Sequence, residues 1–329
     1  MEKKWFIGID ISKKTLDVAI YDQENKKSKT HFKVANDTKG FKEMIKLFKA
    51  EKVIFNNAFI CMEYCGIYGL EIGFFLENKI GFCFCSPLHI KRSLGITRGK
   101  NDKLDAFKIA RFSYLFRDEL SPSSMPTATM LKLKTLMAER HRTVKASTID
   151  KQVLKELSSQ LDKKAVSRVQ KRLKASTADI SAIEKEVTTL IMENPELKKN
   201  YKLLITIIGY GLVNATMMIL CTNNFEGITN ARSMACYCGI APFEYSSGTS
   251  IRGKTKVSNL ANKRMKAYLT NAARSAIVHD PELRIYYKRK REEGKEHGTV
   301  INAVKFKLIT RAFAVINRGT PFVKLRTAG

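Results

Sequence analysis

The sequence predicts a mixed α/β domain at the N-terminus, a helical middle segment with coiled-coil spacing, and a mainly α-helical domain at the C-terminus. Strand-like and helix-like segments alternate over residues 1–120, and a linker with two prolines follows. Long helices without strands are expected over residues 121–198, and a second compact domain over residues 199–329. A chain of 329 residues is long enough for about two domains of roughly 150 residues each.

The N-terminal domain is predicted from a change in apolar periodicity along the chain. Apolar runs separated by short turns predict strands over residues 5–12, 15–22 and 30–36. Residues 36–51 begin with capping residue types and then place apolar residues at helical spacing. Further strands are predicted over 57–64 and 80–87, with a helix over 66–79 between them and a last helix over 101–116. The predicted order is β-β-β-α-β-α-β-α, with the first strand central and the fourth beside it.

The middle segment begins after Pro122 and Pro126. Its apolar residues recur every three or four positions, as in a helix seam: Leu154, Leu157, Leu161, Ala165, Val169, Leu173, Ile180, Ile183, Val187 and Leu190. Contact between two copies of the chain and packing of two helices within one chain would both produce this spacing.

The C-terminal domain is predicted to begin with two apolar helical segments hinged at Gly209 and Gly211. Backbone N–H groups at such a hinge can bind phosphate, although ordinary helix packing would also use glycines there. Residues 237–257, YCGIAPFEYSSGTSIRGKTKV, predict a basic loop rich in glycine and serine, and residues 262–278 predict another helix.

The charge of the chain indicates its class of partner. Lysine and arginine number 59 against 31 aspartates and glutamates, which gives a formal net charge of +28. This excess predicts a polyanionic partner, because each cation that neutralises a phosphate releases condensed counterions. The sequence contains no apolar run of 18 or more residues, and Asp10 interrupts the apolar run near the N-terminus. We therefore expect a nucleic-acid partner, no membrane partner and a cytoplasmic location.

Seven cysteines are distributed over the chain: Cys61, Cys65, Cys83, Cys85, Cys221, Cys236 and Cys238. Their spacings lack the recurring C-x-x-C or histidine partners that are typical of zinc sites. We therefore expect reduced thiols packed in the core in preference to a zinc site.

Four carboxylates are predicted to meet at one edge of the N-terminal sheet. Asp10 lies in the first strand, and Glu63 ends the fourth strand, which the predicted order places beside the first. Asp102 and Asp105 are three residues apart and share one face of the last helix. Because such acids repel one another unless hard cations lie between them, the set predicts a site for two Mg²⁺ ions about 3.5–4 Å apart.

Each acid also has an ordinary structural explanation. Asp102 could cap the helix, Asp105 could be a helix-start acid, and Glu63 could be a solvated residue at a strand end. Asp10 is harder to explain in this way, because an acid between apolar strand residues needs a partner. Asp17 lies on the second strand, but no other acid has the spacing that would match it.

The basic loop is the second candidate site. A Ser-Ser-Gly sequence at residues 246–248 lies close in sequence to Arg252, Lys254 and Lys256. Taken alone, this combination favours phosphate binding over nucleophilic attack, because no histidine is nearby to act as a base.

Four segments in this order carry a family resemblance: IGIDISKKTLDVAI, CMEYCGIYG, KNDKLDAFKIA and GIAPFEYSSGTSIRGKTKVSNLANKRMKAYL. They resemble the DEDD transposases of the IS110 insertion-sequence family, whose relatives include the Piv-type DNA invertases. The resemblance implies a ribonuclease H/RuvC-like N-terminal domain, a coiled-coil middle and a C-terminal transposase domain.

The resemblance also implies roles for residues. The metal-binding Asp-Glu-Asp-Asp tetrad falls on Asp10, Glu63, Asp102 and Asp105, and the nucleophilic serine falls on Ser247. Nucleic-acid contacts are expected at Arg98, Lys100, Gly209, Gly211, Ser246, Ser250, Arg252, Lys254, Lys256, Lys263 and Arg264. Ser246 and Ser250 are the alternative nucleophiles if the loop register differs.

The implied activity is cleavage and rejoining of DNA strands with Mg²⁺. The implied partners are donor and target DNA, a bridge RNA and further copies of the chain in a dimer or tetramer. A site-specific DNA invertase, a RuvC-like structure-specific nuclease and a non-catalytic nucleic-acid-binding scaffold remain as alternatives.

Overall fold

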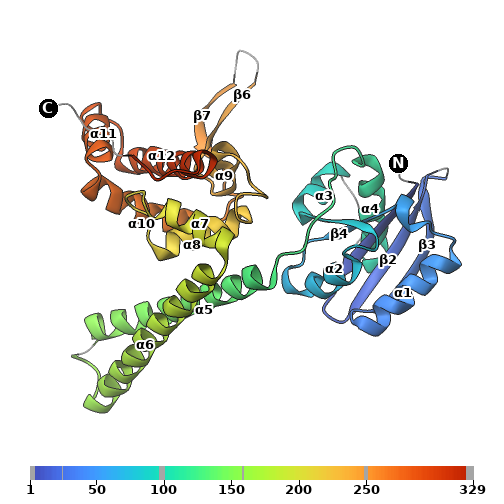
Figure 1. The fold of residues 1–329 in the computed structure, drawn as a ribbon, viewed down its shortest axis with the longest axis horizontal. Coiled ribbons are helices and arrows are strands. Elements are labelled where there is room, and N and C mark those ends of the chain that lie inside the picture. The colour runs from blue at the N-terminus through green and yellow to red at the C-terminus, as the bar shows by residue number, and fades with distance from the viewer. Residues whose placement is uncertain (1–3, 24, 96–100, 158, 248–250, 324–329) are drawn as a thin grey trace. The chain divides into compact units, whose positions relative to one another are not determined.

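The computed structural model describes residues 4–23, 25–95, 101–157, 159–247 and 251–323 (Figure 1). The chain divides into two compact units, residues 1–125 and 126–329. Among the described residues, no helix has the length and apolar character needed to cross a membrane.

The first unit is built on a five-stranded mixed sheet. The strands are β1 (Trp5–Ile11), β2 (Thr15–Asp22), β3 (Lys27–Ala35), β4 (Ala58–Glu63) and β5 (Gly81–Cys85). Their order across the sheet is β3-β2-β1-β4-β5. The first three strands are antiparallel neighbours, whereas β4 runs parallel to β1 and β5 runs parallel to β4. The predicted arrangement, with β1 central and β4 beside it, is confirmed.

Successive strand residues point to opposite sides of the sheet, so both faces carry side chains on which helices can pack. Helices cover both faces. On one face, α1 (Thr38–Ala50) and α2 (Leu70–Leu76) pack on apolar residues from all five strands. On the other face, α4 (Asp102–Leu115) lies against β1 and β2. Two short 3₁₀ turns, η1 (Phe55–Asn57) and η2 (Gly66–Gly69), flank β4. The sequence reading did not predict α3 (Pro87–Ser93), which follows β5 directly.

Gly8 in the middle of β1 lets α4 lie directly on the sheet. A Cβ atom at residue 8 would lie 2.2 Å from the carbonyl oxygen of Ala106 and 2.2 Å from the backbone nitrogen of Ala110. Both of these atoms belong to the backbone of α4, and Ala106 and Ala110 are fully buried. Small residues on both elements therefore set how closely α4 approaches β1.

The second unit begins with two long helices, α5 (Ala128–Leu157) and α6 (Lys163–Glu193). They pack on each other as an antiparallel pair within the chain, in which Arg140 pairs with Glu184 at 2.6 Å and Arg172 with Asp150 at 2.6 Å. Much of the predicted apolar seam lies on α6, where Val169, Ile183 and Val187 are buried.

Shorter helices form the rest of the second unit: α7 (Pro195–Leu204), α8 (Leu212–Thr222), α9 (Ala231–Tyr237), α10 (Lys263–His279), α11 (Pro281–Glu292) and α12 (His297–Arg318). They share one apolar core with residues from α5 and α6. The unit is therefore mostly helical, as predicted.

One prediction for this unit is wrong. Residues 237–257 are not a loop throughout, because they contain the antiparallel hairpin β6 (Pro242–Ser247) and β7 (Ile251–Val257). The prediction of a loop rested on the glycines and serines of this segment. Phe243, Thr255 and Val257, however, have the aromatic and β-branched side chains that favour strands.

The contact at Gly8 gives a stability prediction. Gly8→Ala should lower the free energy of unfolding by about 1–3 kcal/mol, because a methyl group there can be accommodated only if α4 shifts. Gly298→Ala is the control, because a Cβ atom at residue 298 meets nothing within 4 Å and alanine favours the helix. Urea unfolding measures both effects, and equal stability of the two variants would contradict the packing argument.

Candidate active site and nucleic-acid interface

The first candidate site lies where β1 and β4 end. Asp10 is the penultimate residue of β1 and Glu63 is the last residue of β4. The parallel register pairs Ile9 with Met62, so the next residues along the two strands are Asp10 and Glu63. Asp10 alternates with Gly8 along β1 and therefore lies on the face that α4 covers. The two predicted strand acids are thus brought to one edge of the sheet.

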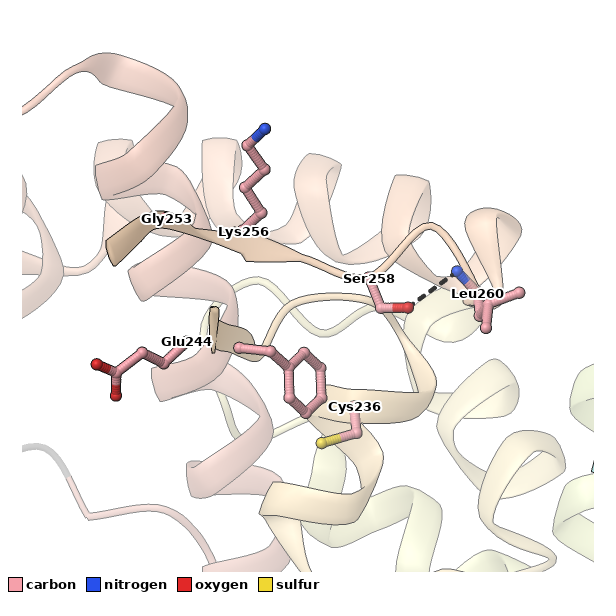
Figure 2. A pocket seen from close by; sticks show the side chains of 7 residues that line it. Cys236, Glu244, Gly253, Lys256, Ser258 and Leu260 are labelled. Carbon is pink, nitrogen blue, oxygen red and sulfur yellow. Dashed lines mark hydrogen bonds between the residues drawn. The ribbon is translucent and has the colours of Figure 1, made fainter. Parts of the chain in front are cut away.

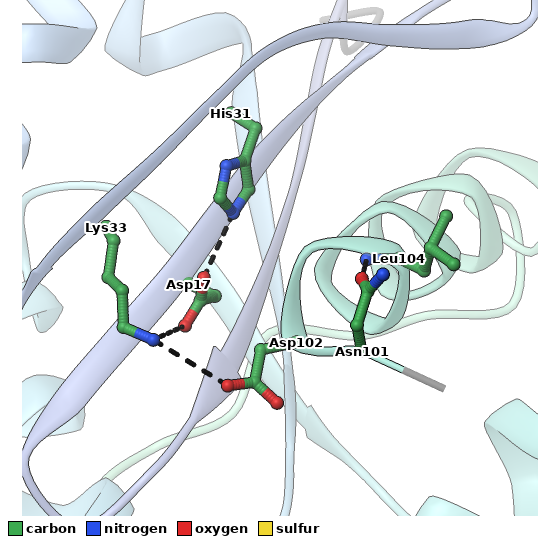
Figure 3. Close-up of polar contacts among 6 residues, drawn as sticks. All are labelled: Asp17, His31, Lys33, Asn101, Asp102 and Leu104. Carbon is green, nitrogen blue, oxygen red and sulfur yellow. Dashed lines mark hydrogen bonds and ion pairs between the residues drawn. The ribbon is translucent and has the colours of Figure 1, made fainter. Parts of the chain in front are cut away.

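The two helix acids lie in the first turn of α4. Asn101 is the N-cap, and its side-chain oxygen accepts the backbone N–H of Leu104 at 2.8 Å (Figure 3). The alternative in which Asp102 caps the helix is therefore wrong. Capping by Asn101 leaves the carboxylates of Asp102 and Asp105 available for other partners, and Asp105 pairs with Lys108 at 2.9 Å.

The four acids interact electrostatically. The pKa of Asp10 is raised to about 6, first by burial and then by the negative charges of Glu63, Asp102, Asp105 and, last, Asp17. Such repulsion among carboxylates is typical of sites that bind cations or perform acid–base chemistry.

The four carboxylate groups interact, but their oxygen atoms do not form a tight cluster. Among the described residues, no three carboxylates bring ligand oxygens within 4.8 Å of one another. Ion pairs explain part of this spacing, since Lys33 lies 3.6 Å from Asp102 and Lys108 lies 2.9 Å from Asp105. Carboxylate oxygens are nevertheless the donors that Mg²⁺ prefers, so the chemistry of the set fits this ion.

A second group of polar residues borders these acids, and the sequence reading missed it. Asp17 is buried and lies opposite Asp10 in the β1–β2 register. Its carboxylate is 3.0 Å from Nε2 of His31 and 3.1 Å from Nζ of Lys33 (Figure 3). Lys33 therefore bridges Asp17 and Asp102, and its hydrogen bond with Asp17 raises the pKa of the lysine. The β2–β3 register pairs Asp17 with Lys33, so this contact could be recognised only once that register was known.

The predicted serine lies in the hairpin of the second unit. Ser247 ends β6 and pairs with Ile251, while exposed Ser246 pairs with Arg252. Lys254 lies further along β7. Ser250, Arg98 and Lys100, which were also predicted to contact nucleic acid, lie outside the described residues.

A pocket of about 720 Å³ lies beside the base of the hairpin (Figure 2). Its lining residues are Cys236, Phe243, Glu244, Gly253, Lys256, Ser258 and Leu260. Phe243 and Leu260 are 49% and 57% exposed, and the hydroxyl of Ser258 accepts the backbone N–H of Leu260 at 3.1 Å. An exposed aromatic ring next to a lysine can stack on a base while the cation contacts phosphate.

A neighbouring pocket contains a buried lysine that the sequence reading also missed. Lys305 on α12 lines this pocket together with Lys266 and exposed Phe306. Burial lowers the pKa of Lys305 to about 8, and the positive charges of Lys266 and Arg274 add to the effect. Isoleucines precede and follow Lys305 by four residues, so a cation on an apolar helix face was visible in the sequence.

The remaining predicted contacts lie at helix starts. Lys263 and Arg264 are exposed in the first turn of α10, which Asn262 caps. Gly211 is the N-cap of α8.

Gly209 has a packing function. Its φ is +100°, and a Cβ atom would lie 2.7 Å from the carbonyl oxygen of Ala272 on α10. Its own carbonyl accepts a hydrogen bond from the side-chain amide of Asn214 at 3.0 Å. Packing thus accounts for Gly209, and phosphate contact at Gly209 and Gly211 stays a prediction.

Two transposase family profiles match this chain, and several known proteins resemble it. Residues 7–197 match a transposase family profile of the IS110 DEDD type, and residues 201–288 match the transposase profile for the IS116/IS110/IS902 family. Pilin gene-inverting proteins of Moraxella bovis and Moraxella lacunata are each 26% identical over 98% of both chains. An uncharacterized 43.6 kDa protein of insertion element IS110 from Streptomyces coelicolor is 28% identical over 45% of this chain and 35% of its own length.

The raised pKa of Asp10 predicts a pH dependence of stability. The folded protein holds this proton up to about pH 6, whereas the unfolded chain releases it near the ordinary value of 3.8. Between these values the folded state binds more protons, so this group makes the free energy of unfolding fall as pH rises. Asp10→Asn should remove that decline.

Urea unfolding of metal-free protein at several pH values around this window checks the prediction. Asp118→Asn is the matched control, because the Asp118 side chain is 88% exposed and should leave the profile unchanged. If the Asp10→Asn profile runs parallel to that of the unchanged protein, the carboxylate cluster does not perturb Asp10.

Proposed function

The chain belongs to the IS110 family of transposases and is a DNA recombinase, and from this premise we propose a mechanism that uses two sites. The first is a Mg²⁺-binding tetrad of Asp10, Glu63, Asp102 and Asp105. The second is a nucleophilic serine at Ser247. The observation that supports the first site best is the shared electrostatic environment of the four acids at one edge of the sheet.

The tetrad would hold the metal through carboxylate oxygens from two strands and one helix. Bound Mg²⁺ would neutralise charge on the reacting phosphate and orient its oxygens. Lys33 forms an ion pair with Asp102, and Lys108 forms one with Asp105. Both lysines can turn toward phosphate oxygens when the carboxylates bind a metal ion instead. The mixed sheet order supports a ribonuclease H/RuvC-like assignment for this domain.

Ser247 would become covalently joined to the DNA strand. Its Oγ would form a bond to phosphorus while one bridging P–O bond breaks. The serine would lose its hydroxyl proton, and the departing strand end would take up a proton and leave as a free hydroxyl. Because one phosphodiester replaces another, the reverse attack by a strand end can rejoin DNA without an added energy source. Arg252, Lys254 and Lys256 lie on β7, the strand that pairs with β6, and would supply positive charge to the phosphate groups of a bound strand.

Nucleic acid would bind largely to the second unit. Lys256, Lys263 and Arg264 are exposed cations, and Phe243 offers an aromatic ring next to one of them. We extend this interface to a bridge RNA that guides the choice of DNA, since the net charge of +28 is large enough to neutralise more than one polyanion. We further propose a homo-oligomer, dimer or tetramer, with coiled-coil contacts through the α5–α6 pair.

Site-specific DNA inversion is the second candidate function. It is favoured by the pilin gene-inverting relatives, which align with this chain over 98% of their length. Inversion and transposition would use the same two sites. An invertible DNA segment next to the gene would favour inversion, and flanks that fold as RNA would favour transposition.

The tetrad proposal predicts that a variant of one acid keeps DNA binding but loses DNA cleavage. Asp102→Ala should bind DNA as the unchanged protein does but cleave it at least about a hundredfold more slowly, because one carboxylate of the metal site is lost. Gel-shift and cleavage assays with element-end DNA and Mg²⁺ measure the two steps. Asp118→Asn should cleave normally, and normal cleavage by Asp102→Ala would indicate a binding scaffold whose acids are structural.

The serine proposal predicts a covalent protein–DNA adduct. The unchanged protein with Mg²⁺ should give an adduct on denaturing gels, and Ser247→Ala should give none. Ser246→Ala is the control and should keep the adduct. The opposite pattern would move the nucleophile to Ser246, whereas cleavage without any adduct in all three proteins would favour hydrolysis by a RuvC-like nuclease.

A further inference from the structure

Three cysteines from two neighbouring strands meet on one face of the sheet in the first unit. Cys61 lies on β4, and Cys83 and Cys85 lie two residues apart on β5. The parallel register places Cys61 directly opposite Cys83. Since residues two apart on a strand share a face, all three thiols point to the same side of the sheet. They are 0%, 3% and 6% exposed, respectively.

The three sulfur atoms form a small triangle. The Sγ atoms of Cys83 and Cys85 are 3.6 Å apart, and all three lie within 4.8 Å of one another. The centre of an equilateral triangle with sides in this range is about 2.1–2.8 Å from each corner, which brackets the usual zinc–thiolate distance of about 2.3 Å. A metal ion at the centre would therefore need only small side-chain movements.

We propose that Cys61, Cys83 and Cys85 form a binding site for a soft, thiophilic metal ion of the Cd²⁺, Zn²⁺ or Cu⁺ class. Within the described residues, this is the one group of potential ligands whose atoms come this close together. Sulfur ligands select such ions over Mg²⁺, which prefers oxygen ligands and retains water.

The surroundings suit a dry thiolate site. Phe59, Ile90, Ile109 and Phe112 pack around the three thiols and shield them from water. Cys85 is the last residue of β5 and the most exposed of the three.

The site is separate from the carboxylate cluster, although it is close in sequence. Cys61 precedes Glu63 by two residues on the same strand and points to the same face. One sheet face thus carries a group of soft sulfur donors and, at the strand ends, a group of hard oxygen donors. The inference does not depend on the proposed recombination mechanism.

Titration of the reduced, full-length protein with Cd²⁺ tests the proposal. Binding should produce sulfur-to-cadmium charge-transfer absorbance in the ultraviolet, and a large excess of Mg²⁺ should not displace the ion. Cys83→Ala should weaken binding by more than the roughly tenfold to hundredfold that loss of an outer-shell partner costs. Cys238→Ala is the matched control, because Cys238 is equally buried but lies in the second unit.

Thermal unfolding provides a second measurement that also shows whether each variant is folded. Cd²⁺ should raise the Tm of the unchanged protein and of Cys238→Ala, but not that of Cys83→Ala. Asp10→Asn should retain the full response, which separates this site from the tetrad. Absence of the charge-transfer band, or a Cys83→Ala variant with unchanged affinity, would show that the three thiols only fill the core.

Discussion

The close approach of α4 to β1 at Gly8 is the contact on which the proposed tetrad depends. Asp10 comes two residues after Gly8 on β1, and Asp102 lies four residues before Ala106 on α4. Any side chain at residue 8 would push the helix outward, because its nearest neighbours are backbone atoms that cannot rotate away. The distance between the strand acids and the helix acids is thus set by apolar packing of small residues, one turn away from the charges themselves.

This packing brings the four carboxylates together. The surrounding residues offset only part of the resulting electrostatic repulsion. Burial and four neighbouring acids raise the pKa of Asp10, while Lys33 forms an ion pair with Asp102 and Lys108 forms one with Asp105. Buried Asp17 extends this balance, since it accepts contacts from both His31 and Lys33. Fold stability alone would favour fewer acids at this edge. Their retention agrees with the rule that electrostatic strain concentrates at functional sites.

Local sequence patterns predicted the parts of the structure that depend on local rules. Strand order in the first unit followed from apolar runs and turn spacing, and the positions of Asp10 and Glu63 followed from strand order. The contacts that went unnoticed depend on register between strands or on packing between helices. Asp17 and Lys33 meet only because β2 and β3 pair as they do, and the thiol triangle requires Cys61 to lie opposite Cys83. The β6–β7 hairpin was missed because glycine and serine content outweighed its strand-forming residues.

In the proposed mechanism, the acids of the first unit act on the reacting phosphate and the cations of the second unit bind nucleic acid. We expect the acid cluster of the first unit to contribute little to affinity, because negative carboxylates repel phosphate unless cations neutralise them. The second unit carries exposed Lys256 and Arg264, together with Lys305, whose burial and cationic neighbours make an anion a favourable partner. Affinity for nucleic acid should therefore follow the lysines and arginines of the second unit and fall with salt. Catalysis should instead follow the carboxylates of the first unit, because a change in one of them alters the reacting phosphate and leaves most of the binding surface intact.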